Sequence, residues 1–101
     1  MRLLIVGGTG LISSQLSAIA LEQGDEVTLI NRGKSAIPPA PGAHIIHADA
    51  ENPEALRAAL RGPRLRGERF DAVVQFIAYH PQHVRDDVET FRRLADRYLL
   101  I

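Results

Sequence analysis

The feature that most constrains this chain is a cluster of glycines directly after a short apolar run. Leu3 to Val6 is wholly apolar and ends at Gly7-Gly8-Thr9-Gly10, after which apolar residues recur at helical spacing. A short, wholly apolar run is typical of a strand buried on both faces, as in parallel sheets. A strand that turns through glycines into a helix is the first part of a unit in which a helix connects two parallel strands.

The rest of the chain continues this alternation of strand and helix. Gly24 is placed to end the first helix, and Asn52 followed by Pro53 is typical of a helix start. We expect the first helix to bury Ile12, Leu16, Ile19 and Ala20, and the last to bury Val84, Val88, Phe91, Leu94 and Ala95. Further strands are predicted at 27–30, 45–46, 70–78 and from 98 onward, and helices at 11–23, 53–61 and 82–97.

This alternation predicts the α/β class: an open, parallel, doubly wound sheet of about five strands. We expect the strands in the order 3-2-1-4-5, which is common in sheets of this kind. One domain spans residues 1–101, and we expect the chain to stop inside the fifth strand. Right-handed crossovers place the helices at 53–61 and 82–97 on one face, which leaves only the helix at 11–23 on the other. We therefore expect exposed apolar surface there, covered either by a partner, such as a second copy in a homodimer, or by further chain.

Composition excludes several classes of protein. The 12 basic and 12 acidic residues give no net charge, which argues against a dedicated nucleic-acid binder, and the chain has no cysteine for disulfides or thiolate chemistry. The apolar runs are far shorter than the roughly 20 residues of a membrane span. His80 and His83 have no cysteine or acid at metal-ligand spacing beside them, so we predict no metal site. We expect a globular cytoplasmic domain without a membrane partner.

The glycine cluster predicts a phosphate site. A helix that begins just after a strand offers free backbone N–H groups and the positive end of its dipole, and glycines let the backbone approach a phosphate closely. Two registers fit, Gly8-x-Gly10-x-x-Ser13 and Gly7-x-x-Gly10-x-x-Ser13, and both place Ser13 where a third glycine is usual. The alternative is a tight turn without a ligand. Gly33-Lys34-Ser35 is not the end of a P-loop, because position 28 is Thr and prolines follow.

Four segments together resemble a known family. GGTGLISSQL, VTLINRG, HADAENPEAL and DAVVQFIAY resemble the N-terminal half of extended short-chain dehydrogenases/reductases, and most of all the NAD(P)-dependent epimerase/dehydratase family. The resemblance implies a Rossmann-like fold that binds a dinucleotide. It implies pyrophosphate contacts from Gly7, Gly10, Leu11 and Ile12, adenine contacts from Asp49 and Ala50, and a cofactor lining from Phe76, Ile77 and Ala78. Ile77 departs from the small residues usual in that lining.

The end of the second strand bears on the choice of cofactor. Dinucleotide folds that prefer NAD place an acid there to bind the ribose hydroxyls, whereas this chain has Asn31-Arg32-Gly33-Lys34. Cationic groups bind the extra phosphate of NADP, so NADP is the expected cofactor. Asn31 is still able to bind a bare hydroxyl, which leaves NAD as the alternative. An ordinary solvated loop is the alternative for Arg32 and Lys34.

The catalytic pair of the resembled family, a Tyr with a Lys four residues later, is absent from these residues. The single Lys is Lys34, Tyr79 has His83 four residues on, and Tyr98 lies too near the end. We therefore expect the cofactor-binding part of a truncated NADP-preferring enzyme that acts on a sugar nucleotide or another small hydroxyl or carbonyl substrate. The alternatives are a non-catalytic NAD(P)-sensing regulatory protein and, more distantly, an RNA-binding relative that uses the arginines around 57–69.

Overall fold

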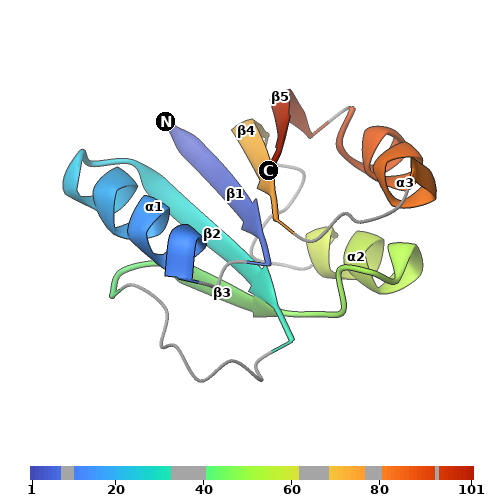
Figure 1. Cartoon of the computed structure of the whole chain (residues 1–101), viewed down its shortest axis with the longest axis horizontal. Helices are drawn as coiled ribbons and strands as arrows, with labels where there is room; N and C mark the ends of the chain where they lie inside the picture. The colour runs from blue at the N-terminus through green and yellow to red at the C-terminus, as the bar shows by residue number, and fades with distance from the viewer. Residues whose placement is uncertain (8–10, 33–40, 62–68, 77–80, 93) are drawn as a thin grey trace.

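The computed structural model describes residues 1–7, 11–32, 41–61, 69–76, 81–92 and 94–101. These residues form a sheet of five parallel strands in the order β3-β2-β1-β4-β5, as the sequence predicted. Helix α1 lies on one side of the sheet and helices α2 and α3 lie on the other (Figure 1). The strands are β1 (Arg2–Val6), β2 (Glu26–Asn31), β3 (His44–His47), β4 (Phe70–Gln75) and β5 (Ala95–Leu100), and the helices are α1 (Leu11–Glu22), α2 (Pro53–Leu60) and α3 (Pro81–Phe91).

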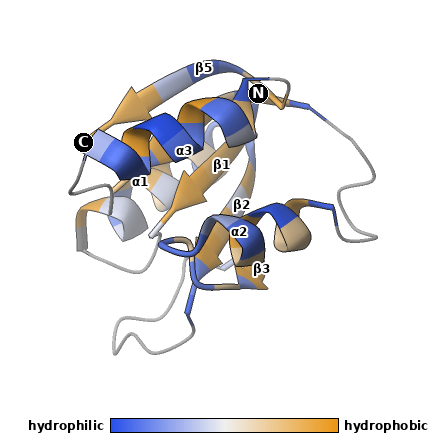
Figure 2. Ribbon diagram, turned by 90° about the vertical axis from the view of Figure 1, so that its right-hand side faces the viewer, coloured by the Kyte–Doolittle hydropathy of each residue, from blue (hydrophilic) through white to orange (hydrophobic). Residues whose placement is uncertain are grey.

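The central strands form because both of their faces are covered by apolar contacts. Successive side chains of a strand point to opposite faces, so a wholly apolar strand contributes to two cores. Figure 2 shows apolar strands behind helices α2 and α3, which carry polar residues on their outer surfaces. On the side of α2 and α3 the core contains Leu4, Val6, Ile30, Ala50, Leu56, Leu60, Phe70, Val73 and Phe91. On the side of α1 it contains Leu3, Ile5, Ala20, Val27, Leu29, Ala72 and Val74.

The predicted helix signals at 24 and 52 are confirmed. Gly24 follows α1 with a φ of 86°, a left-handed conformation that favours glycine, and its N–H donates to the Leu21 carbonyl. The Asn52 side chain accepts hydrogen bonds from the backbone N–H groups of Glu54 and Ala55 at 3.0 and 3.2 Å. Both helices therefore have the bounds that local sequence signals favour. No helix among the described residues is long and apolar enough to cross a bilayer.

The predicted buried stripe of α1 is partly wrong. Ile12 and Ile19 are 66% and 54% exposed, whereas Ser13 and Ser17 are almost fully buried. The Ser17 hydroxyl donates to the Ser13 carbonyl at 2.7 Å, which satisfies it inside the helix. Small residues face the sheet because α1 packs closely against the strands. Ile12 and Ile19 point outward, whereas Leu16 and Leu21 are partly buried against the core. Val88 of α3, also predicted to be buried, is 53% exposed.

The boundary between α3 and β5 also differs from the prediction. The helix ends at Phe91 rather than at 97, and the strand begins at Ala95 rather than at Tyr98. The Phe70 N–H donates to the Leu94 carbonyl, and Ala95 then pairs with Phe70 in the parallel ladder. Pairing with β4 satisfies backbone groups that would otherwise continue the helix, so strand pairing overrides the apolar spacing. The described part of the fourth strand ends at Gln75, and residues 77–78 lie outside the described ranges.

Candidate dinucleotide site

The candidate site is the edge of the sheet at which all five strands end. Val6 pairs with Ile30 on one side and with Gln75 on the other, so β1, β2 and β4 end side by side. In open parallel sheets, ligands bind in the crevice beyond the carboxyl ends of the strands, where the chain order reverses. The reversal occurs here between β1, which leads through α1 to β2, and β4, which leads to β5 on the other side. This edge therefore positions the end of each strand around one site.

Gly7 turns the chain at the end of β1. Its φ is 83°, a left-handed conformation in which a side chain is strained, and its N–H donates to the Ile30 carbonyl at 2.8 Å. The hydrogen bond extends the pairing with β2 by one residue before the chain leaves the sheet. Leu11 then begins α1. Gly10, the next residue predicted to contact pyrophosphate, lies outside the described residues.

The first turns of α1 fit a negatively charged ligand. They contain no acidic residue, so no carboxylate opposes the positive end of the helix dipole. Ser13 is 1% exposed, and its hydroxyl donates to the Gly7 carbonyl at 3.4 Å, which places the helix close to β1. The Ser14 hydroxyl oxygen is buried and has no hydrogen-bond partner within the described ranges. Ile12, whose backbone was predicted to contact pyrophosphate, points its side chain outward.

The end of β2 carries the residues predicted to distinguish NAD from NADP. Asn31 is the last residue of the strand and is 8% exposed, and its carbonyl accepts a hydrogen bond from the Ala48 N–H at 2.8 Å. Arg32 follows and is exposed. Asn31 therefore belongs to the packed end of the sheet, while Arg32 reaches solvent beside it. Lys34 lies outside the residues that the structure describes.

The connection from β3 to α2 holds Asp49 and Ala50 at the same edge. The exposed Asp49 carboxylate accepts a hydrogen bond from the Glu51 N–H at 3.0 Å, and its carbonyl accepts one from the Asn52 N–H at 3.1 Å. This short turn gives Asp49 a fixed position in solvent and leaves its second carboxylate oxygen without a described hydrogen bond. Ala50 is 4% exposed and packs into the core on the side of α2.

The end of β4 positions Phe76. Its N–H donates to the Val6 carbonyl at 3.1 Å, and its half-buried ring packs against the core on the side of α1. Phe76 therefore lies next to the end of β1, close to where the glycine turn begins. Ile77 and Ala78, also predicted to line the cofactor, lie outside the described residues, as do Tyr79 and His80.

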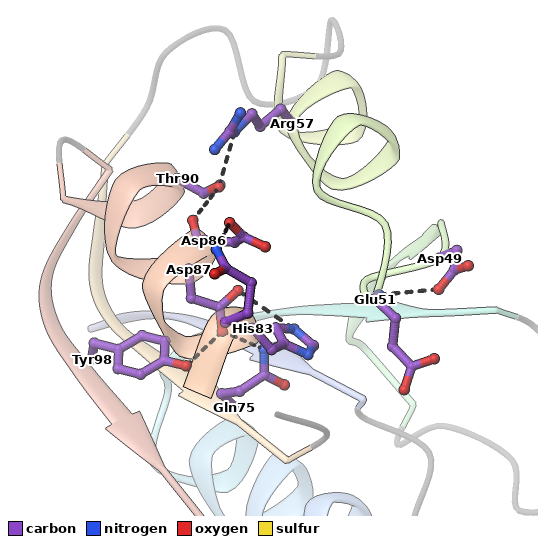
Figure 3. A network of polar contacts seen from close by, with 10 residues as sticks. Asp49, Glu51, Arg57, Gln75, His83, Asp86, Asp87, Thr90 and Tyr98 are labelled. Carbon is purple, nitrogen blue, oxygen red and sulfur yellow. Dashed lines mark hydrogen bonds and ion pairs between the residues drawn. The ribbon is translucent and has the colours of Figure 1, made fainter. Parts of the chain in front are cut away.

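A buried polar cluster behind this edge was not predicted from the sequence. Asp87 of α3 is 1% exposed, and its carboxylate accepts hydrogen bonds from Gln75 Nε2 at 2.8 Å and from the Tyr98 hydroxyl at 2.5 Å (Figure 3). His83 Nε2 lies 3.6 Å from the other carboxylate oxygen of Asp87, so the expectation that no acid stands at ligand spacing beside His83 is wrong. The sequence does contain a signal for this cluster: Asp87 lies three residues after Val84 and four before Phe91, on the stripe that faces the sheet.

Tyr98 serves in this cluster as a neutral donor. Burial raises the pKa of its phenol well above the ordinary value, and the hydrogen bond to the Asp87 carboxylate and the negative charge of that group raise it further. A general acid of the kind used in hydride transfer needs the opposite shift, toward neutral pH. The geometry therefore assigns Tyr98 a role in packing and hydrogen bonding, in agreement with its exclusion as a catalytic tyrosine.

The site as a whole has the features of a dinucleotide-binding protein. A glycine with positive φ, a helix start without acidic residues and a buried serine hydroxyl without a partner lie at the switch point of a parallel sheet. These features suit a pyrophosphate, which needs backbone and hydroxyl donors rather than carboxylates. Within the described residues no cluster of three or more His, Asp or Glu side chains is placed to hold a metal ion.

Comparison with known families agrees with this class. The sequence profile of the NAD(P)H-binding family matches residues 7–96, which is most of the chain. The chain belongs to the NAD(P)H-binding family, and it is an NAD(P)-binding domain with a Rossmann fold. No curated protein matches it. The predicted NAD(P)-binding class and Rossmann-like fold are confirmed.

Solved structures share the fold at low sequence identity. The chain superposes on the enzyme WbmG of Bordetella bronchiseptica, solved in complex with NAD, with a TM-score of 0.74 and 22% identity, covering 99% of this chain and 36% of that one. A Rossmann-fold NAD(P)-binding family protein from Shigella flexneri superposes with a TM-score of 0.69 and 21% identity, covering 98% of this chain and 49% of that one. UDP-glucose 4-epimerase superposes with a TM-score of 0.61 and 21% identity, covering 93% of this chain and 30% of that one. The chain thus spans half or less of the length of each of these three structures.

Proposed function

We propose that this chain is the NADP-preferring cofactor-binding portion of an extended short-chain dehydrogenase/reductase of the epimerase/dehydratase type. The observation that carries the proposal is the sheet edge that brings Gly7, the start of α1 and the exposed Arg32 together at the switch point. A bound nicotinamide dinucleotide supplies or accepts a hydride. The substrate that fits this reaction type is a sugar nucleotide or another small molecule with a hydroxyl or carbonyl group.

Each part of the site has a separate role in this proposal. Gly7, Gly10, Leu11 and Ile12 offer backbone groups to the pyrophosphate, and the Ser14 hydroxyl is an additional donor near the helix start. Asp49 has a free carboxylate oxygen with which to accept from the adenine amino group. Phe76, with Ile77 and Ala78, lines the cofactor. All of these roles except that of Ser14 follow the resemblance residue by residue.

The glycine turn is tested by a matched pair of substitutions at the two ends of α1. Gly7 and Gly24 have nearly the same backbone conformation, with φ of 83° and 86°, so alanine strains each by roughly 1–2 kcal/mol. Only Gly7 lies at the site. We expect Gly7→Ala to weaken NADP binding in calorimetry by at least about tenfold, and Gly24→Ala to leave it unchanged. Equal affinities in the two variants contradict the assignment of the turn.

The preference for NADP is tested at Arg32. Arg32→Asp removes a cationic partner of the 2′-phosphate and adds a repulsive charge. A hydrogen bond to a charged group contributes about 1.5–3 kcal/mol, so the ratio of NADP to NAD affinity should fall by about tenfold or more. Arg92→Asp is the control, because it makes the same change in charge beyond the end of α3, at the opposite edge of the sheet. A ratio that stays constant in Arg32→Asp shows that NADP preference does not depend on Arg32.

A non-catalytic NAD(P)-sensing protein is the second candidate. The observation that favours it is the hydrogen bond from the Tyr98 hydroxyl to the buried Asp87, which leaves the described residues with groups that bind and no tyrosine placed as an acid at the site. The two candidates differ in turnover. The protein is assayed for NADP-dependent conversion of sugar nucleotides and small carbonyl compounds, and cofactor affinity without turnover favours the sensor.

A further inference from the structure

Helix α3 is attached to the sheet by very few buried side chains. Over Pro81–Phe91, only Asp87 and Phe91 are fully buried, and Val88 is exposed. Phe91 is the last residue of the helix, so it fixes the end that lies far from the cofactor edge. The first two turns, which lie nearest that edge, are held by the hydrogen bonds of Asp87 to the strands and by the packing of His83, whose side chain is 12% exposed. A buried carboxylate is an unusual anchor for a helix, because it needs hydrogen-bond donors to offset the loss of water.

The two donors to Asp87 come from different strands, one that precedes α3 in the chain and one that follows it. Gln75 is the last residue of β4, six residues before the helix begins at Pro81, and Tyr98 belongs to β5, after the helix. Both hydrogen bonds are short, at 2.8 and 2.5 Å. Figure 3 shows the two side chains pointing toward Asp87 from the neighbouring strands. The bond to Gln75 joins a residue before the segment 77–80 to a residue after it, whereas the bond to Tyr98 joins two residues that both follow that segment.

The end of β4 is the fixed side of this link. The Gln75 carbonyl accepts a hydrogen bond from the Ile101 N–H at 2.9 Å, and the Phe76 N–H donates to the Val6 carbonyl at 3.1 Å. Backbone bonds to both neighbouring strands thus hold the end of β4 independently of the Gln75 side chain. What the side chain adds is a fixed position for α3 relative to that strand.

On the basis of the proposed function, we propose that Asp87 is a positioning residue of the dinucleotide site and that it acts through Gln75. By binding Gln75, Asp87 fixes the start of α3 beside Phe76, and so fixes both described ends of the connection that leaves β4 at the cofactor edge. His83, in the first turn of α3, lies 3.6 Å from Asp87 and moves with the same helix. Loss of the link lets the first turns of α3 shift away from the site.

The two donors provide a matched pair for the experiment. Gln75→Leu and Tyr98→Phe each remove one neutral donor from Asp87 with little change in side-chain volume, so both lower stability through the same carboxylate. We expect Gln75→Leu to raise the dissociation constant for NADP by about tenfold or more, because small displacements of positioning groups have effects of that size. Tyr98→Phe should change it by less than about threefold, because its bond does not flank residues 77–80. Affinities are measured by calorimetry at a temperature at which circular dichroism shows each variant to be folded.

A second pair separates geometry from charge. Gln75 Nε2 and the Tyr98 hydroxyl both donate to the same carboxylate oxygen of Asp87. Asp87→Asn keeps one side-chain oxygen that can accept both bonds, so we expect affinity within about threefold of the parent protein. Asp87→Ala removes both bonds and should behave like Gln75→Leu. Thr90→Val is the control on the same helix, because the Thr90 hydroxyl accepts from Arg57 Nε of α2 at 3.1 Å, away from Asp87.

Several results would overturn the inference. Equal losses of affinity in Gln75→Leu and Tyr98→Phe, or in Asp87→Ala and Thr90→Val, would show that the cluster affects binding only through the overall stability of the fold. Normal affinity in Gln75→Leu, or Asp87→Asn as weak as Asp87→Ala, would also contradict it. If Asp87→Ala does not fold, the comparison of Gln75→Leu with Tyr98→Phe still tests whether Asp87 acts through Gln75. Failure of the parent protein to bind any nicotinamide dinucleotide refutes the proposed function instead, so the two failures are distinct.

Discussion

Close packing of α1 on β1 predicts that Ser13 does not tolerate a larger side chain. Ser13 is 1% exposed, and its hydroxyl donates to the Gly7 carbonyl at 3.4 Å. Ser13→Val replaces the hydroxyl with two methyl groups at a contact between helix and strand. Overpacking costs about 1–3 kcal/mol, and the lost hydrogen bond adds roughly 0.5 kcal/mol, at the low end because the bond is long. Serine and valine have similar helix propensities, so that contribution nearly cancels.

We therefore expect Ser13→Val to lower the free energy of unfolding by about 1.5–3.5 kcal/mol in urea titrations. The matched control is Ala18→Val, which places the same side chain on the exposed side of α1 and should cost no more than about 0.7 kcal/mol through helix propensity. Because α1 begins at the cofactor edge, Ser13→Val should also weaken NADP binding, whereas Ala18→Val should not.

The result that would refute this reasoning is a loss of stability in Ser13→Val no larger than that in Ala18→Val. It would mean that the helix moves away from β1 at little cost and that the small residue at this position has no packing role. Normal NADP affinity in a clearly destabilised Ser13→Val variant would show that the packing of α1 at Ser13 contributes to stability but does not set the position of its first turn for binding.

Two further predictions concern the other helices. Asn52→Ala removes the acceptor of two backbone N–H groups at the start of α2 and should lower the free energy of unfolding by about 1 kcal/mol in urea; a loss below about 0.3 kcal/mol would show that water replaces the cap. The raised pKa of Tyr98 means that the folded protein keeps this phenol neutral where the unfolded chain ionises, so its contribution to stability is complete below about pH 10 and declines at higher pH. The free energy of unfolding measured from pH 9 to 11.5 should therefore fall more steeply in the parent protein than in Tyr98→Phe, and parallel curves would contradict the assigned shift.

The sequence alone determined the architecture of this protein. Wholly apolar strands, the glycine turn after β1 and local helix signals such as Gly24 and Asn52 act over a few residues, so they can be identified without knowledge of the fold. Their alternation predicted an open parallel sheet with right-handed crossovers, and the expected strand order 3-2-1-4-5 is the one that the structure shows. The same reasoning placed the predicted cofactor residues at one edge, since the carboxyl ends of parallel strands meet there.

Only the tertiary structure decided which residues of each helix face the sheet and where the last helix ends. Apolar spacing predicted that Ile12 and Ile19 would be buried, but the short distance between α1 and β1 favours Ser13 and Ser17 instead. Apolar spacing also extended α3 to 97, whereas pairing of Ala95 with Phe70 begins a strand there. The burial of Asp87 depends on donors from two strands that are distant in the sequence. Each outcome depends on contacts between elements, and a pattern within one segment contains no information about its neighbours.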